Sequence, residues 1–434
     1  MKRVLIITYY WPPSGGAGVQ RWLKFAKYLP ENGWQPVIYT PENPEAPAED
    51  LSLLKDIPPS CEVIKRRIFE PYSFYRIFTG RGSGEKVNAG FLDEGRSPGL
   101  KDKMAVWVRG NLFIPDARRF WIKPSIRFLQ QYLKQHPVDV IVSTGPPHSM
   151  HLIARALKKR TGIPWVADFR DPWTGIDFYH QLMLSKYADK RHHKLEKEVL
   201  VAADRVVTVG WEGARELSEI GGRHVDVITN GYDQDDVADD EEFIDPVRED
   251  RDFVIRHVGA MNKDRNHDVF WRALREVNLD SGAKRKVRVE LIGKSDAAVR
   301  KSIEKYDMLD YVEFISYIPH NKIGSLLKHA DMLYLPINNT PNAKGILTGK
   351  IFEYLASGTP VLGVGPIDGD AARVLLESNA GQMFDFDDFE GVVAWMLDVN
   401  LSHFVGQKAQ RNNNTDFQRK KLLKGYVDIF NELL

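Results

Sequence analysis

The sequence predicts an α/β protein of two domains, each built on a doubly wound parallel sheet. Short apolar runs alternate with amphipathic helical stretches along most of the 434 residues. Strands that are apolar on both faces and separated by helices are typical of parallel sheets covered by helices on both sides. The alternation stops after Asn230-Gly231, in the acidic stretch YDQDDVADDEEFIDPVRED, and then starts again. Such a stretch buries little and indicates a linker or exposed loop, so we place the domain boundary near residue 232.

The first domain, residues 1–231, is predicted to hold six strands. Amphipathic helices are expected between them, as at Val19–Leu29 and His151–Lys159. Residues 41–125 are rich in Pro and Gly and break the alternation, and we interpret them as an insertion of loops and short helices. The strands are expected at Val4–Thr8, Pro36–Thr40, Val138–Thr144, Trp165–Phe169, Arg205–Gly210 and Val225–Thr229.

The second domain, residues 232–415, repeats the same pattern and is followed by an amphipathic helix over Asp416–Leu434. Ligands of parallel sheets bind beyond the carboxyl ends of the strands, and two such domains are expected to leave a cleft. The strands are expected at Phe253–Val258, Val287–Ile292, Tyr311–Ile315, Met332–Pro336, Pro360–Val364 and Gln382–Phe386.

Composition places the chain among ordinary globular proteins, with 43% hydrophobic and 27% charged residues. No apolar run approaches the roughly 18 residues that a membrane span needs, and the short run after Met1-Lys2-Arg3 fits a first buried strand better than a signal peptide. A single cysteine, Cys61, excludes internal disulfides and predicts a cytoplasmic location. No metal-ligand spacing is present. The adjacent His192 and His193 are interpreted as part of a solvated helix surface.

Charge is unevenly distributed, although the formal net charge is only +1. Residues 65–127 hold fourteen Lys and Arg against six Asp and Glu, together with ten aromatic residues. Basic and aromatic residues together indicate an anionic partner, such as a lipid surface at the inner face of the membrane or a phosphate-bearing acceptor, and less readily nucleic acid. The alternative is an irregular insertion with a small core of its own and a solvated basic face.

Unusual loops follow several of the predicted strands, where ligands of parallel sheets bind. Ser14-Gly15-Gly16-Ala17-Gly18 offers backbone N–H groups without side chains that would block a ligand. The other loops are Gly145-Pro146-Pro147-His148-Ser149, Arg170-Asp171-Pro172-Trp173, the segment 259–266 and the segment 337–348.

The most informative stretch is INNTPNAKGILTGKIFEYLASGTPV. Thr348-Gly349-Lys350 opens a short helix, whose N-terminal amides carry roughly +0.5 charge and suit a phosphate. Lys350 adds a cation, and Glu353 lies one turn further, where it can accept hydrogen bonds from sugar hydroxyls. Gly358 ends the helix. Taken alone, the stretch also fits a structural helix with a solvated Lys and Glu.

Four motifs together resemble the retaining glycosyltransferases of family 4. They are TYYWPPSGGAGVQRWLKFAKYL, PWVADFRDPW, ITNGYD and GKIFEYLASGTPVLGVG, and the last is the most specific. The resemblance spans nearly the whole chain and implies the GT-B fold, with two Rossmann-like domains. It implies transfer of a sugar from a nucleotide-diphosphate donor, bound mainly by the second domain, to an acceptor bound mainly by the first. The helix 416–434 would then return to complete the first domain.

The resemblance also assigns donor-binding residues. Glu353 matches the glutamate expected to bind the donor ribose, and Arg265 falls where the family keeps a basic residue for the diphosphate. The remaining donor-site candidates are Lys263, Lys350, Thr348, Gly345, Gly15 and Gly16. Fixed cations and amides stabilise the charge that develops on a diphosphate leaving group, so we predict neither a metal nor a cofactor besides the donor.

Two features depart from the family pattern. The first of its paired glutamates, which would contact the transferred sugar, is replaced by Gly345, eight positions before Glu353. The histidine that often follows the mid-domain strand is replaced by Arg170, with Asp171 next to it. His148 is another candidate for the position that faces the sugar, and a capping or acceptor-side role is its alternative. We therefore take His148, Arg170 and Asp171 as the catalytic candidates, while Asp168 and Asp171 also fit structural ion pairs with Arg170 or Arg119.

The resulting functional hypothesis is a glycosyltransferase that builds a surface polysaccharide or glycoconjugate on a glycan or lipid-linked acceptor. Retention would follow from front-face attack, in which the leaving phosphate helps to deprotonate the acceptor. Two alternatives stay open: a catalytically degenerate subunit that only binds nucleotide sugar, and a nucleotide-sugar epimerase or hydrolase on the same scaffold. A nicotinamide enzyme is disfavoured, because the glycine loop lacks the G-x-G-x-x-G spacing and the second strand ends at Thr40 without an acidic residue.

Overall fold

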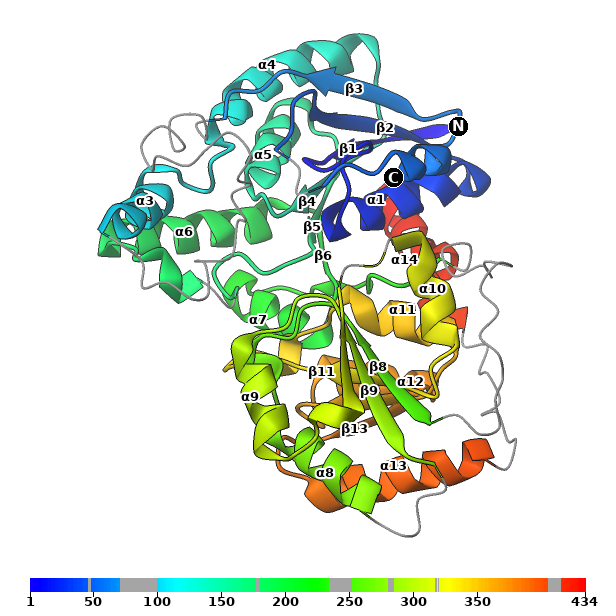
Figure 1. The fold of residues 1–434 in the computed structure, drawn as a ribbon. Helices are drawn as coiled ribbons and strands as arrows, with labels where there is room; N and C mark the ends of the chain where they lie inside the picture. The colour runs from blue at the N-terminus through cyan, green and yellow to red at the C-terminus, as the bar shows by residue number, and fades with distance from the viewer. Residues whose placement is uncertain are drawn as a thin grey trace. The chain divides into compact units, whose positions relative to one another are not determined.

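The computed structural model describes residues 1–45, 48–70, 100–176, 179–233, 252–279, 285–316, 318, 320–404 and 415–434. Contacts divide the chain into two compact units (Figure 1). Unit 1 comprises Met1–Thr229 and Leu422–Leu434, and unit 2 comprises Asn230–Lys421. The first crossing between units thus follows Thr229, and the return falls inside the last helix, after Lys421.

Unit 1 is built on a seven-stranded sheet in the order β3-β2-β1-β4-β5-β6-β7, with every pairing parallel. In register, Leu5 lies beside Val37 on one side and Ile141 on the other. The order reverses between β1 and β4, which are neighbours in the sheet although far apart in the chain. The strands are β1 Lys2–Ile7, β2 Trp34–Pro41, β3 Glu62–Arg66, β4 Val140–Gly145, β5 Trp165–Phe169, β6 Arg205–Thr208 and β7 Asp226–Val227.

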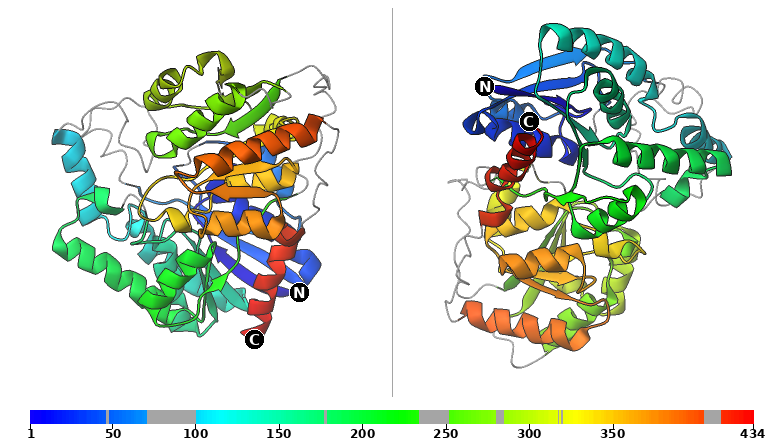
Figure 2. Two further views of the ribbon diagram at one scale, coloured as in Figure 1. Left: turned by 90° about the horizontal axis from the view of Figure 1, so that it is seen from below. Right: turned by 180° about the vertical axis from the view of Figure 1, so that it is seen from behind.

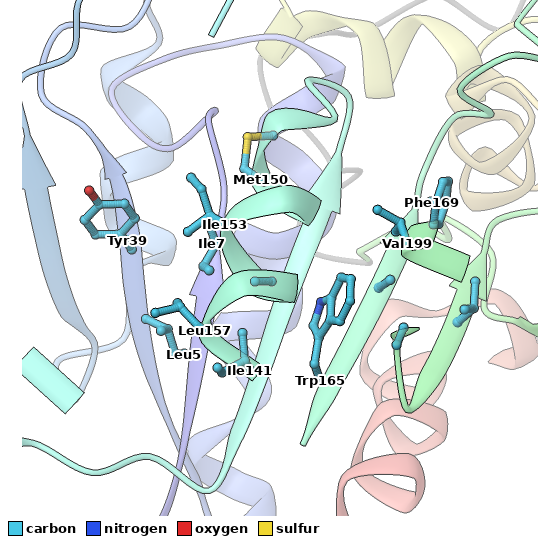
Figure 3. Packing of buried hydrophobic residues seen from close by; sticks show 14 of the residues in the cluster. Leu5, Ile7, Tyr39, Ile141, Met150, Ile153, Leu157, Trp165, Phe169 and Val199 are labelled. Atoms are coloured by element: carbon cyan, nitrogen blue, oxygen red, sulfur yellow. The ribbon is translucent and has the colours of Figure 1, made fainter. Parts of the chain in front are cut away.

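Helices cover both faces of this sheet, as a doubly wound fold requires. One face packs on helices α4 to α7 through a core that includes Leu5, Ile141 and Trp165 (Figure 3). The helical elements of unit 1 are α1 Ala17–Tyr28, η1 Pro30–Asn32, η2 Leu51–Asp56, α3 Leu100–Leu112, α4 Arg119–Gln135, α5 Ser149–Thr161, η3 Tyr179–Leu182, α6 Lys186–Ala202 and α7 Trp211–Gly221.

The opposite face of the sheet packs on α1 and on the end of the chain. Helix α14, Arg419–Glu432, runs beside α1 (Figure 2). It buries Leu423, Tyr426 and Phe430 in one core with Val4 and Trp22. Burying the apolar stripe of α14 against α1 and this sheet is the driving force that returns the chain to unit 1.

A buried polar network lies beneath α1. The carboxylate of Asp168, at the end of β5, accepts hydrogen bonds from the Arg21 guanidinium, the Trp22 indole at 2.7 Å, the Thr144 hydroxyl at 2.9 Å and the Tyr426 hydroxyl at 2.8 Å. Arg21 also donates to the carbonyls of Ile228 and Thr229, each at 2.8 Å. The network therefore fastens the chain just before it leaves unit 1 and just after it returns.

Unit 2 is built on a six-stranded parallel sheet in the order β10-β9-β8-β11-β12-β13. The order reverses between β8 and β11. Because crossovers are right-handed, helices that follow strands on the two sides of this reversal cover opposite faces. Helices α8, α9 and α13 share one core (Figure 1). The strands are β8 Phe253–Val258, β9 Val287–Ile292, β10 Val312–Ile315, β11 Met332–Pro336, β12 Val361–Val364 and β13 Gly381–Phe384.

The helical elements of unit 2 include two short turns that matter for the site, η5 and η7. They are η5 Lys263–Arg265, α8 Asp268–Leu279, α9 Ala297–Lys305, η6 Leu309–Tyr311, α10 His320–Lys328, η7 Ala343–Gly345, α11 Gly349–Ser357, α12 Asp370–Ser378, α13 Phe389–Phe404 and η8 Thr415–Phe417. No helix within the described ranges combines the length and the apolar character that a membrane span needs.

The interpretation of residues 41–125 as an insertion of loops and short helices is wrong in part. Residues 62–66 form β3, which pairs with β2 and extends the sheet, and α4 is a long helix that begins inside the segment. Residues 71–99 lie outside the described residues, as do residues 234–251 of the acidic stretch.

Candidate functional site

The predicted donor segment lies where the strand order of unit 2 reverses. The loop after β8 and the loop after β11 start from neighbouring strands at the carboxyl edge of the sheet, which is where parallel sheets bind ligands. Gly259 begins the first loop and has φ +127°. Gly293, which follows β9, packs against it, because a Cβ added to Gly293 would lie 2.9 Å from the carbonyl oxygen of Gly259. Only glycine adopts these backbone conformations readily.

Arg265 is held in place by both loops. Its backbone N–H is capped by the Asn262 side chain, its Nη1 donates to the Ala260 carbonyl at 3.1 Å, and its Nε donates to Oδ1 of Asn338 at 2.6 Å. The loops are also joined through the backbone, since the Asn339 N–H donates to the Asp264 carbonyl at 2.8 Å. The guanidinium is thereby fixed at the reversal point.

Helix α11 brings a second cation and a carboxylate to the same region. Lys350 lies in its first turn and reaches over Gly259, so that a Cβ on Gly259 would coincide with the Lys350 ammonium. Thr348 is the N-cap, and its buried hydroxyl has no hydrogen-bond partner among the described residues. Gly358 ends the helix with φ +69°, as the sequence predicted.

The electrostatics show that these groups interact. Burial, and then the charge of Arg265, lower the pKa of Lys350 to about 8, although the charge of Glu353 acts to raise it. Burial, and then the charge of Lys350, also lower the pKa of the neighbouring His257 to about 3. The region is thus electropositive, with cations from two separate segments, and suits an anion with more than one negative oxygen.

The other predicted donor residues stand on the same two loops and on α11. Lys263 is exposed on η5, and Gly345 ends η7 with its N–H bonded to the Asn342 carbonyl at 3.1 Å. Glu353 is half-buried on α11, next to Tyr354, whose hydroxyl accepts a hydrogen bond from the Val258 N–H at 3.0 Å. This bond ties α11 to the end of β8 and keeps Lys350 and Glu353 at the strand edge.

In unit 1 the glycine loop follows β1, beside the reversal between β1 and β4. The N–H of Gly15 is already bonded to the Ala48 carbonyl at 2.8 Å, so this amide is not open to a ligand as the sequence had suggested. Gly16 is exposed, has φ +95° and forms the N-cap of α1. Of the two predicted glycines, Gly15 is buried and Gly16 is exposed.

Arg170 follows β5 and lies across the start of α1. A Cβ on Gly18 would meet its Nη1 at 2.8 Å, so Gly18 makes room for this side chain. Arg170 donates to Asp171 at 3.0 Å, whereas Asp168 pairs with Arg21 inside the unit. Arg170 and Asp171 therefore form a partly exposed ion pair, and Asp168 is structural. Arg119 bonds instead to the Leu112 carbonyl.

His148 follows β4 and stands at the N-cap position of α5, where its side chain makes no capping hydrogen bond. Its ring stacks flat on Trp173, with centroids 4.6 Å apart and planes 3° apart. Burial, followed by the charges that His151, His192 and Arg170 would carry, lowers the pKa of His148 well below the usual value, so the ring is neutral at pH 7. His148 and Arg170 are thus brought close enough to interact.

The interpretation of the two adjacent histidines as a solvated surface is wrong for His192. It is buried, and its Nδ1 accepts a hydrogen bond from the Trp173 indole at 3.0 Å. His193 is exposed, as expected. No group of His, Cys, Asp or Glu in the described part of the chain has the geometry of a metal site.

Sequence reasoning missed several residues that build these sites, among them Asn338, Tyr354, Trp173 and His151. Trp173 and Asn338 stand in loops that the sequence singled out, but nothing local indicates what their side chains contact. His151 stands three residues after His148, the helical spacing that places both on one face of α5.

Comparison with family models identifies both halves of the chain. The model described as "Glycosyltransferase Family 4" matches residues 15–236, and the model described as "Glycosyl transferases group 1" matches residues 252–399. None of the curated proteins matches the sequence significantly.

Solved structures share the fold along the whole chain. Sucrose-phosphate synthase from Thermosynechococcus elongatus is 13% identical with a TM-score of 0.62, covering 100% of this chain and 99% of that one. Anabaena HepE, solved in complex with UDP and glucose, is 13% identical with a TM-score of 0.58 and full coverage of both chains. WaaG, a glycosyltransferase involved in lipopolysaccharide biosynthesis, is 14% identical with a TM-score of 0.54, covering 98% of this chain and 99% of that one. The predicted fold, with two doubly wound parallel-sheet domains, is confirmed.

Proposed function

This chain belongs to glycosyltransferase family 4 and has the GT-B fold, and on that premise we propose that it transfers a sugar from a nucleotide-diphosphate donor held by unit 2. The acceptor is a glycan or lipid-linked saccharide held by unit 1, and the pathway is surface polysaccharide or glycoconjugate synthesis. Transfer proceeds with retention. HepE, which shares the fold, was solved with UDP and glucose, and this supports the class of donor.

The observation that carries the proposal is the meeting of Arg265, Lys350 and Glu353 at the strand reversal of unit 2. Two cations and the N-terminus of α11, with the Thr348 hydroxyl that has no partner among the described residues, suit a diphosphate. A carboxylate one turn away suits ribose hydroxyls. A leaving diphosphate gains negative charge as the sugar departs, and fixed cations stabilise that charge without reorganising.

In unit 1, the proposed acceptor residues are His148, Arg170 and Asp171, while Gly16, at the N-cap of α1, stays a candidate for binding the donor. Neutral His148 offers hydrogen bonds to sugar hydroxyls, and Arg170 offers a cation beside the glycine loop. These three remain our catalytic candidates. Retention predicts that the product keeps the anomeric configuration of the donor, and an inverted product would contradict it.

A lipid-linked acceptor is supported by a surface of unit 1. Phe69, Trp107 and Phe120 are all exposed, and Phe69 packs edge-on against Phe120 with centroids 5.6 Å apart. The helices that carry Trp107 and Phe120, α3 and α4, also carry exposed basic residues, namely Lys103, Arg119, Lys123 and Arg127. Aromatic rings among cations suit the interface of an anionic membrane, so we place the protein at the inner membrane face.

A degenerate subunit that binds nucleotide sugar without transferring it is the second candidate, because Gly345 replaces the expected first glutamate. Incubation with donor alone and with acceptor separates the candidates. Transfer to acceptor supports the proposal, binding without turnover supports the degenerate subunit, and conversion of the donor without acceptor indicates an epimerase or hydrolase.

The donor site is tested with a thermal-shift panel of UDP, GDP, dTDP and CMP and their common sugars. One nucleotide family should raise the melting temperature of the wild type, and Glu353→Ala should lose much of that shift. Glu377→Ala is the matched control, because Glu377 lies on α12 and pairs with the exposed Arg373. A panel without any shift would contradict the donor-site proposal.

A further inference from the structure

Two buried imidazoles meet at Gly145, the last residue of β4. His148 Nδ1 and His151 Nε2 are both buried, and neither has a hydrogen-bond partner among the described residues. A Cβ on Gly145 would lie 2.6 Å from His151 Nε2 and 2.9 Å from His148 Nδ1. The two nitrogens therefore face the same side of Gly145, and only a residue without a side chain leaves that space to them.

The far side of His151 determines where its proton lies. The Trp165 indole N–H can only donate, and it donates to Ser143 Oγ at 2.8 Å. Ser143 Oγ is also 2.8 Å from His151 Nδ1. If His151 donated through Nδ1, the buried Ser143 hydroxyl proton would have no acceptor in this network. If the hydroxyl donates to Nδ1, the Trp165 indole, the Ser143 hydroxyl and His151 Nδ1 are all satisfied, and the His151 proton lies on Nε2, which faces Gly145 and His148.

A proton on His151 Nε2 then acts on His148. The Nε2–H group faces the region of His148 Nδ1, and an unprotonated Nδ1 is the favourable neighbour for it. His148 consequently carries its own proton on Nε2. Its ring is held against rotation by flat stacking on Trp173, while His151 stacks on Phe169 with centroids 4.6 Å apart.

We infer that His151 is a positioning residue that holds His148 as its Nε2–H tautomer, so that His148 donates a hydrogen bond to a substrate oxygen. The inference rests on the proposed function in one respect, namely that His148 faces a saccharide. It deepens that function by making His148 a hydrogen-bond donor and not a general base. The proton taken from the acceptor must then go elsewhere.

The tautomers are measured directly by long-range ¹H–¹⁵N correlation on the full chain labelled with ¹⁵N-histidine, without substrate at pH 7. The chain supplies both reference patterns. His267 Nε2 lies 2.8 Å from the Ile337 carbonyl and must carry the proton there, whereas His257 Nδ1 lies 3.0 Å from the Tyr334 carbonyl and must carry it on Nδ1. His148 and His151 should both show the His267 pattern. The His257 pattern at either would overturn the inference.

Variants at residue 151 test the functional half. His151→Phe keeps an aromatic ring for stacking but removes the donor, and it should release His148 into mixed tautomers and lower kcat about tenfold, the effect of roughly one hydrogen bond. His151→Gln, whose amide N–H reaches towards the place of Nε2–H, should restore activity to within about threefold. If His151→Phe fails to fold, Ser143→Ala should mix the tautomers of His151 instead.

The outcomes separate this inference from the proposed function. Unchanged kcat in a folded His151→Phe variant with mixed His148 tautomers would overturn the positioning role and leave sugar transfer untouched. Conversely, a wild type without transfer to any acceptor would contradict the proposed function, while the spectrum of the free protein would still decide the tautomers. The exposed His193→Gln variant is the control and should change neither readout.

Discussion

Replacing Asp168 by asparagine should lower the free energy of unfolding of unit 1 by about 4 kcal/mol. Asp168 is fully buried and pairs with Arg21, which is 2% exposed. The change keeps the size of the side chain but leaves the buried guanidinium without its counter-charge, and breaking a buried pair in this way costs about 3–5 kcal/mol. The amide N–H₂ of asparagine is a donor and would face the donors of Trp22 and Tyr426. We therefore expect a loss of unfolding free energy above the low end of this range.

Urea titration followed by tryptophan fluorescence is the assay. Eight of the ten tryptophans belong to unit 1, so the signal reports mainly on this unit. A loss of about 4 kcal/mol corresponds to a melting temperature lower by about 8–16 °C for a domain of this size. The matched control is Glu219→Gln, which also turns a carboxylate into an amide. Its partner Arg215 is exposed, so we expect a change below about 0.5 kcal/mol.

The pH dependence of stability gives an independent check. Burial acts to raise the pKa of Asp168, but the charge of Arg21 and the hydrogen bonds from Arg21, Trp22 and Tyr426 outweigh it and hold the pKa below 3.8. The stabilisation is therefore complete above the pKa of the unfolded chain and is lost as the pH falls towards the lower folded value. Asp168→Asn should remove this part of the acid dependence. An unfolding free energy within 1 kcal/mol of the Glu219→Gln control, with unchanged acid dependence, would refute the assigned role of the network.

Three further changes test the sites. Burial and Arg265 lower the pKa of Lys350 to about 8, and a bound diphosphate favours the charged amine. Affinity for the nucleoside diphosphate that raises the melting temperature, measured by calorimetry, should therefore fall as the pH rises from 8 to 9, with proton uptake on binding; Lys350→Arg should bind without this dependence, and an equal slope in both would contradict the assignment. Gly259→Ala should weaken binding of the same diphosphate about tenfold or more, because φ +127° is strained for alanine and the Cβ displaces Lys350, while Gly213→Ala, whose Cβ has space, should bind as the wild type does. Trp107→Ala with Phe120→Ala should reduce sedimentation with phosphatidylcholine–phosphatidylglycerol vesicles several-fold but not with phosphatidylcholine alone, and undiminished sedimentation would remove this surface from the membrane proposal.

Strands in the interior of the sheets were predicted best, and one edge strand, β3, was missed. Trp165–Phe169, Phe253–Val258, Val287–Ile292 and Met332–Pro336 have the predicted bounds. Each is paired on both sides, and three or four consecutive apolar residues, or an alternation of apolar and charged residues, mark it in the sequence. β3, by contrast, has the sequence EVIKR, is only half-buried or exposed, and has a single neighbour. The charged residues of such an edge strand interrupt the alternation of apolar and polar residues by which a strand is recognised in a sequence.

The sequence contains a local signal that would have assigned His192 to the buried face of α6. Ala188, His192, Leu195 and Val199 follow helical spacing along α6, and all four are buried. Adjacent histidines were weighed as a metal pair and set aside, but adjacent residues on a helix point in directions about 100° apart, so each has to be assigned separately. The apolar stripe assigns His192 to the inside.

The assembly of the donor site depends on strand order, which no local pattern contains. Arg265 meets Asn338 because β11 lies next to β8, although β9 and β10 come between them in the chain. Alternation of strands and helices predicts a parallel sheet whichever order the strands take, and the right-handed crossover rule assigns helices to faces only after that order is known. The family resemblance implied the GT-B fold and supplied the expectation that Arg265 and Lys350 serve one ligand. The inferred tautomer of His148 depends on strand order in the same way. The spacing between His148 and His151 is visible in the sequence. Ser143 and Trp165 fix the proton of His151, however, only because β4 and β5 pair side by side, with Ile141 opposite Trp165.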